Sequence, residues 1–338
     1  MNPLLSLLEP FRRLDLERWA AFRPSVPPVA VELDRDEMVL VRLRRRRHGR
    51  PGLEAHASRP MPEQGVGTSI LRPNLGATDE TARRARQLFE STGTRPGKVV
   101  LVLPDNLARV SLVSFPERPP NRRHLDEMVR FKLRRSVPFR LEEAVISYQE
   151  LPGDGSELHL LVALMLRSVA EQYERVFEAS GASPGRVELS TLSLFNLCRG
   201  EMAKAAVGGQ DVALLNCARG YFSLLIVRGP RILFYRCKSV AEGGEERTAI
   251  EPGMNRELAT SVSYYREKLG GQAIATTFVR DVTSPPGARG ASLEALGLGT
   301  VVPVDPASGV ALPEGLRLDA AVGQQIASAV GAASGRGE

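Results

Sequence analysis

Cysteine and histidine are the first candidates for chemistry in this sequence, as nucleophiles or as metal ligands. There are three cysteines, Cys198, Cys217 and Cys237, an odd number with no Cys-x-x-Cys pair, and four widely scattered histidines. Neither set has the spacing of a metal site. All three cysteines stand in apolar surroundings, so we expect reduced, buried thiols, as in cytosolic proteins.

Hydroxyl, glycine and carboxylate groups provide three further candidates, and none has the partners that catalysis needs. Residues 190–193 read Ser-Thr-Leu-Ser with no histidine nearby, and Gly243-Gly244 is a short turn rather than a phosphate-binding loop. Glu142 and Glu143 are adjacent, on an expected surface turn. These residues alone therefore predict neither an enzyme nor a metal site.

The composition allows a sizeable core and favours negatively charged partners. The chain has 338 residues, a length typical of more than one domain, and 43% of them are hydrophobic. Its formal net charge is +6, which favours acidic partners or anionic surfaces. Much of the charge lies in two runs: Arg42, Arg44, Arg45, Arg46, Arg47 and Arg50, and Arg122, Arg123, Arg130, Lys132, Arg134 and Arg135. The first run contains no aromatic residue for stacking on bases, which favours a solvated hairpin tip over a nucleic-acid contact.

No stretch of the sequence approaches the about 20 apolar residues that span a bilayer. The N-terminus lacks the basic segment of a signal peptide, and Glu9 interrupts its short apolar run. We therefore expect a cytoplasmic protein that reaches a membrane only through a partner. Residues 1–28 are the one exception to this expectation. They form an amphipathic arm that either packs on the body or docks on a partner or a membrane.

The chain then shows two similar blocks of strands, each followed by a helix and another strand, with a compact unit between them. The first block has these expected elements: strands at 29–33 and 38–43, a helix at 79–93 capped by Thr78 or Asp79, a buried strand at 98–103, and a strand at 108–115 pairing back on it. The expected elements of the compact unit are a helix at 122–136, strands at 145–151 and 158–164, and a helix at 168–180. The expected elements of the second block are strands at 212–215, 222–227 and 231–237, a helix at 255–269, a strand at 274–279, and a late helical stretch at 318–332.

This duplicated plan resembles that of actin, sugar kinases and Hsp70, and the details resemble the PilM family of type IV pilus assembly proteins, related to FtsA and to the GspL cytoplasmic domain. The supporting stretches are residues 29–43, 131–139 with its closing Val-Pro-Phe, 142–145 with Tyr148, 234–236 and 257–265. The resemblance covers about residues 29–332. It implies an α/β actin-like fold (ASKHA, a duplicated ribonuclease H-like fold) with an inserted FtsA/PilM-type small subdomain.

The resemblance also implies a division of the chain. The parts are an arm at 1–28, a first half at 29–109 completed by 184–209 and 312–332, the insert at 110–183, a second half at 210–311, and a disordered tail at 333–338.

Actin-like proteins bind ATP between two glycine-bearing hairpins, and the matching positions here depart from that pattern. The residues of this degenerate site are Glu32, Asp34, Asn216, Arg219 and Gly220. Glu32 stands at the first aspartate position and Asp34 at a glycine position, which adds negative charge beside the phosphates. There are four other departures: Val39 replaces a lysine, Asn216 replaces an aspartate, Ala218 replaces a glycine, and Arg280-Asp281 replaces a Gly-Gly turn. We expect no bound cofactor and no hydrolysis, with weak binding of ATP and Mg²⁺ left open.

The resemblance implies a protein partner, the cytoplasmic tail of a PilN-like bitopic inner-membrane protein, and a link from it to the pilus motor ATPases. The expected contact residues are Phe131, Arg134, Arg135, Val137, Pro138 and Phe139. Phe131 lies off the apolar stripe of its helix, so it is either a boundary residue packed on the next element or a contact anchor. The alternatives are a GspL-like component of a type II secretion platform and a small-molecule kinase of the same fold.

Overall fold

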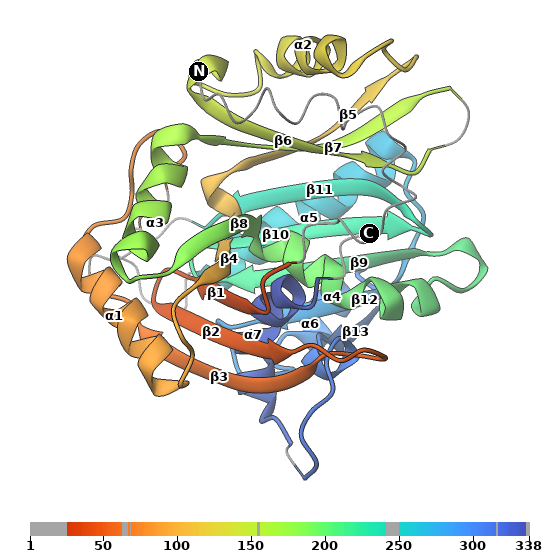
Figure 1. Cartoon of the computed structure of the whole chain (residues 1–338). Helices are drawn as coiled ribbons and strands as arrows, with labels where there is room; N and C mark the ends of the chain where they lie inside the picture. Colours follow the sequence, from red (N-terminus) through yellow and green to blue (C-terminus); the bar gives the residue numbers. More distant parts are fainter. Residues whose placement is uncertain are drawn as a thin grey trace.

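The computed structural model describes residues 26–335 except 63–66, 68, 154–155, 241–249 and 316. The predictions for the N-terminal arm up to residue 25, for the Gly243-Gly244 turn and for the last three residues lie outside the described part. Two five-stranded sheets form the body, and a three-stranded sheet with helix α2 (Arg122–Leu133) lies at one end of the molecule (Figure 1).

The first sheet has the strand order β3-β2-β1-β4-β8. Its strands are β1 (Val29–Leu33), β2 (Glu37–Arg44), β3 (Gly52–Pro60), β4 (Lys98–Leu103) and β8 (Ser183–Leu189). The first three form an antiparallel meander, and β4 and β8 are added in parallel. Every residue of β1 is buried, as is β4 beyond Lys98, because the two central strands are covered on both faces.

The second sheet repeats this plan with the order β11-β10-β9-β12-β13. Its strands are β9 (Asp211–Ala218), β10 (Tyr221–Arg228), β11 (Arg231–Ser239), β12 (Ile274–Asp281) and β13 (Thr300–Pro303). Again three antiparallel strands come first and two parallel strands follow. The internal duplication predicted from the sequence is therefore present in the topology.

The third sheet has the order β5-β7-β6, with the strands β5 (Arg109–Phe115), β6 (Ala144–Leu151) and β7 (Leu158–Leu166). β5 pairs antiparallel with β7 along its length. The prediction that this segment pairs back on the 98–103 strand was wrong. A 3₁₀ turn, η5 (Asp105–Leu107), intervenes and carries the chain out of the first sheet.

The helices are α1 (Thr78–Ser91), α2 (Arg122–Leu133), α3 (Arg167–Ala179), α4 (Ser190–Ala205), α5 (Ile250–Leu269), α6 (Gly290–Ala295) and α7 (Ala320–Ala333). Three further short 3₁₀ turns are η6 (Leu141–Glu143), η7 (Val207–Gly209) and η9 (Pro306–Ser308). The cap of α1 is Ala77 rather than Thr78 or Asp79. α2 ends three residues earlier than expected, and Asn121 caps it by accepting a hydrogen bond from the His124 amide at 2.9 Å.

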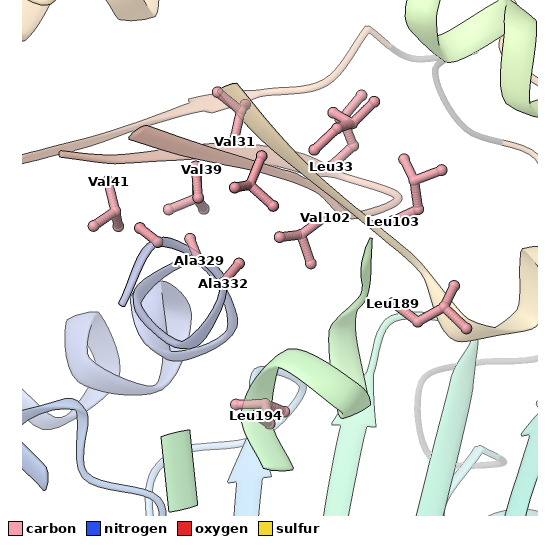
Figure 2. Packing of buried hydrophobic residues seen from close by; sticks show 14 of the residues in the cluster. Val31, Leu33, Val39, Val41, Val102, Leu103, Leu189, Leu194, Ala329 and Ala332 are labelled. Carbon is pink, nitrogen blue, oxygen red and sulfur yellow. The ribbon is translucent and has the colours of Figure 1, made fainter. Parts of the chain in front are cut away.

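Helix α7 packs closely in the body because its side chains are small. Ala329 and Ala332 lie beside Val39 and Val41 of β2 (Figure 2). On its other side α7 contacts α4. There a Cβ at Gly331 would come within 2.0 Å of the Ser193 carbonyl oxygen, so only glycine allows this approach of the two helices.

The arginine-rich run lies at the end of the β2–β3 hairpin, and residues 44–50 are all exposed. This confirms the predicted hairpin tip. Four arginines of the run bind within the molecule. Arg42 and Arg44 pair with Glu54 at 3.3 Å and 2.9 Å. Arg50 donates to the Ala307 carbonyl at 2.8 Å, and Arg45 donates to the Val26 carbonyl.

Candidate functional site

The first predicted hairpin lies at the end of β1. Glu32 is only 2% exposed, and Asp34, in the turn to β2, is also buried. The backbone amide of Arg35 donates to the Asp34 carboxylate at 2.7 Å, and the Asp34 amide donates to the Glu37 carbonyl at 2.8 Å. These bonds hold the turn in place, and the residues Glu32 and Asp34 both line the cleft between the two hairpins.

The second predicted hairpin joins β9 to β10 in the other sheet. Gly220 has φ 83° there, a conformation that favours glycine. The Asn216 side chain is fully buried and donates to the hydroxyls of Ser190, at 3.1 Å, and Thr191, at 3.0 Å. Arg219 reaches across to the first hairpin, where it pairs with Asp36 at 3.1 Å.

The guanidinium of Arg280 lies between the two hairpins. Arg280 is near the end of β12 and is only 2% exposed. Its Nη2 lies 3.1 Å from a Glu32 carboxylate oxygen, and its Nε donates to the Gln324 carbonyl of α7 at 2.9 Å. Nη1 lies 3.3 Å from both the Ser190 hydroxyl and the Asn216 side-chain oxygen. One side chain thus joins both sheets, α4 and α7.

The charges of the site are two buried carboxylates, those of Glu32 and Asp34, and the single guanidinium of Arg280 that interacts with both. Burial raises the pKa of Glu32 and of Asp34, and Arg280 offsets only part of that rise. Burial would lower the pKa of Arg280, but Glu32, Asp34, Tyr221 and Asp105 together raise it above its ordinary value. Arg280 is therefore a permanent cation in the region where the resemblance implies a nucleotide.

The remaining cleft between the hairpins is small. Its volume is about 220 Å³, and its lining includes Glu32, Asp34, Arg219 and Arg280. Small-molecule sites usually measure about 300–1,000 Å³. Among the residues that the structure describes, no group of histidine, cysteine, aspartate and glutamate side chains is arranged to hold a metal ion.

Sequence reasoning missed the polar network behind this cleft. Asp105 is fully buried on η5, and its carboxylate accepts from the Thr191 amide at 3.0 Å, the Ser223 hydroxyl at 2.7 Å and the Thr191 hydroxyl. Ser190 and Thr191, which lack a histidine, serve here as hydrogen-bonding groups of the core. The one available signal was an aspartate directly after a buried strand.

The predicted partner residues separate into two groups. Phe131, Arg134 and Arg135 of the α2 region line a hollow of about 1,040 Å³, together with Phe115, Glu127, Met128 and Lys132. Phe131 is 80% exposed, so the alternative in which it packs on the next element was wrong.

The other predicted residues are not part of the described lining of this hollow. Val137 and Phe139 are half-buried and pack against the apolar core between the three-stranded sheet and α2, while Pro138 is exposed. The structure therefore brings three of the six predicted contact residues together around the hollow.

No protein-family model and no curated protein sequence matches the chain. Among solved structures, PilM of the PilM-PilN type IV pilus biogenesis complex matches with a TM-score of 0.78 at 19% identity, over 92% of this chain and 98% of that chain. The chain has the fold of PilM. The actin-like α/β fold predicted from the sequence is thereby confirmed.

Two weaker matches are the ethanolamine utilization protein EutJ from Carboxydothermus hydrogenoformans and the cytoplasmic domain of EpsL from the type II secretion system of Vibrio cholerae. The first has a TM-score of 0.46 at 11% identity and covers 93% of each chain. The second has a TM-score of 0.42 at 13% identity, over 75% of this chain and 81% of that one. Within the described residues, no helix has both the length and the apolar character to cross a membrane.

Proposed function

We propose that this chain is a cytoplasmic adaptor of the type IV pilus inner-membrane platform, without ATPase activity. It binds the short cytoplasmic tail of a PilN-like bitopic membrane protein and links that protein to the pilus motor. The fold supports this proposal, since the PilM structure that it matches over 92% of the chain comes from a PilM-PilN complex.

The observation that carries the proposal is the exposed Phe131 in the hollow on α2. Phe131 is 80% exposed, and Phe115 and Met128 line the same hollow. Apolar side chains grouped in a groove are typical of an interaction site. Aromatic and arginine side chains are also the commonest anchors of protein interfaces. The lining has more positive than negative side chains: Lys132, Arg134 and Arg135 against Glu127. This charge favours an apolar tail segment with neutral or acidic residues on either side of it.

The location at the membrane is tested by fractionating cells. We expect the protein in the membrane fraction when the PilN-like partner is present and in the soluble fraction when its gene is deleted, because the partner holds the protein there. Expression of the partner without its cytoplasmic tail is the matched control and should also release the protein. Persistent membrane association in the deletion strain would contradict the proposal and would direct attention to residues 1–25.

The absence of ATPase activity is tested by titration with a fluorescent ATP analogue and by phosphate release. We expect no release above background and at most weak binding, because the Arg280 guanidinium lies between the hairpins and only about 220 Å³ remains. Two buried carboxylates beside the cleft would also repel the phosphates. Magnesium-dependent binding in the low micromolar range would contradict this account of the hairpins.

A further inference from the structure

Two sheet edges face each other between the inserted subdomain and the second half of the body. β5 is the terminal strand of the three-stranded sheet, and β11 is the terminal strand of the second five-stranded sheet. The two strands contact each other, and no strand pairing joins them in the described residues. A groove of about 1,030 Å³ lies between them and extends to α5. Terminal strands have one edge of unpaired backbone groups, which an added extended chain can pair with.

Large apolar side chains line this groove although they face solvent. Tyr264 and Leu269 of α5 are each 48% exposed, and Leu112 of β5 is also exposed. Apolar side chains gathered in a groove, rather than scattered singly, are typical of an interaction site. They suit an occupant that has apolar side chains of its own.

The charged residues of the groove are all positive. Arg109, Arg236 and Lys238 belong to its lining, and the described lining includes no aspartate or glutamate. Glu257 lies nearby and pairs with Lys238 at 3.2 Å and with Arg236 at 3.6 Å. One carboxylate opposes three cations, so the groove has a positive excess that favours a negatively charged occupant.

One buried amide in the groove has no partner. Asn106, on the η5 turn that precedes β5, is only 7% exposed, and neither its side-chain nitrogen nor its side-chain oxygen has a hydrogen-bond partner in the described structure. Leaving a buried polar group unpaired is unfavourable. A carboxamide offers one donor and one acceptor side by side, which matches the C=O and N–H of a peptide backbone.

We propose that the groove between β5 and β11 binds a short extended peptide of a partner protein, with acidic residues alternating with apolar ones. The peptide backbone pairs with a strand edge and with Asn106. Its apolar side chains lie against Leu112, Tyr264 and Leu269, and its acidic side chains lie near Arg109 and Lys238. Addition of a strand to an open sheet edge is a common mode of peptide recognition. This site is distinct from the hollow at Phe131 and does not depend on the proposed tail partner.

The test uses a phage-displayed library of random dodecapeptides selected on the immobilised full chain. We expect enriched sequences in which acidic and apolar residues alternate, and protection of the β5 and β11 amides from hydrogen exchange by the best synthetic peptide. Binding of that peptide should fall at least tenfold in the Arg109→Glu, Lys238→Glu variant. It should remain unchanged in Phe131→Ala and in Arg123→Glu, a charge reversal on α2. Circular dichroism checks the double variant, and Lys238→Glu alone replaces it if the fold is lost.

Three results would overturn the proposal. The first is no enrichment of any peptide family. The second is binding that is lost in Phe131→Ala and retained in the double variant, which places the peptide in the α2 hollow. The third is a carbodiimide cross-link in the free chain from Lys238 to Glu9, Asp15 or Glu17, which makes the occupant a segment of the same chain.

Discussion

Replacing Arg280 with methionine is expected to lower the free energy of unfolding by about 3–5 kcal/mol, the usual cost of removing one partner of a buried ion pair. Methionine keeps most of the volume but leaves Glu32, which is 2% exposed, without its cation at 3.1 Å. It also removes the hydrogen bonds to the Gln324 carbonyl and to Asn216. Urea unfolding followed by circular dichroism measures the change.

The size of this loss should depend on pH. The folded-state pKa values of Glu32 and Asp34 are raised above their ordinary values by burial. A carboxyl with a higher pKa in the folded state binds its proton more tightly there than in the unfolded state. Its contribution to stability is therefore fully present below the unfolded-state pKa and is lost as pH rises through the folded-state pKa. Without Arg280 both pKa values rise further. We therefore expect a smaller loss at pH 3.5, below the ordinary pKa of both carboxyls, than at pH 8.

Arg219→Met is the matched control, because Arg219 belongs to the same cleft but forms a solvent-exposed ion pair with Asp36. Pairs of that kind contribute about 0–1 kcal/mol. Equal urea midpoints for the Arg280 and Arg219 variants at pH 8 would contradict the assignment of Arg280 as the internal cation of the site.

Combining Phe131→Ala with Arg134→Glu is expected to weaken binding of the PilN-like tail by at least about 30-fold, the effect of losing about 2 kcal/mol at an interface anchor. The fold should be unaffected, because Phe131 is 80% exposed and Arg134 is also exposed. Fluorescence anisotropy with a labelled tail peptide measures the affinity, and circular dichroism checks the fold.

Arg123→Glu is the control for this variant. It reverses a charge on the same helix, and Arg123 is not among the described lining residues of the hollow. Arg123 pairs with the lining residue Glu127 at 3.3 Å, but exposed pairs of this kind contribute little, so its effect on binding should be small. Wild-type affinity in a folded Phe131→Ala, Arg134→Glu protein would remove the hollow from consideration as the tail site.

The fold was largely predictable because local sequence patterns determine it. Continuous apolar runs such as 98–103 predicted central strands, and the structure buries β4 from Val99 to Leu103. The repeated order of strands, helix and strand predicted the duplication that the two sheets show. The partner of β5 was predicted wrongly, because an antiparallel neighbour close in sequence is the commonest arrangement and nothing local marks η5 as a crossover.

The site was predictable only in part, because it depends on residues far apart in the chain. The sequence identified Arg280 as a departure from a glycine turn, but not as the partner of Glu32, 248 positions earlier. Asp105 and Thr191 are also separated by 86 positions. Spacing within an element reveals which face a residue occupies, and it carries no information on contacts between elements. For Phe131 the pattern left two alternatives. Its exposure excludes the one in which it packs on the next element, and its role as a contact anchor stays a prediction.

Calorimetric titration of the purified full chain with the cytoplasmic tail peptide of the PilN-like protein, in buffer without nucleotide, tests the central claim most directly. The account predicts saturable binding at one site with micromolar affinity, unchanged when Mg-ATP is added, because Arg280 already joins the two halves of the body. A scrambled tail peptide should give no heat of binding. Absence of binding by the native tail, or binding that requires Mg-ATP, would contradict it.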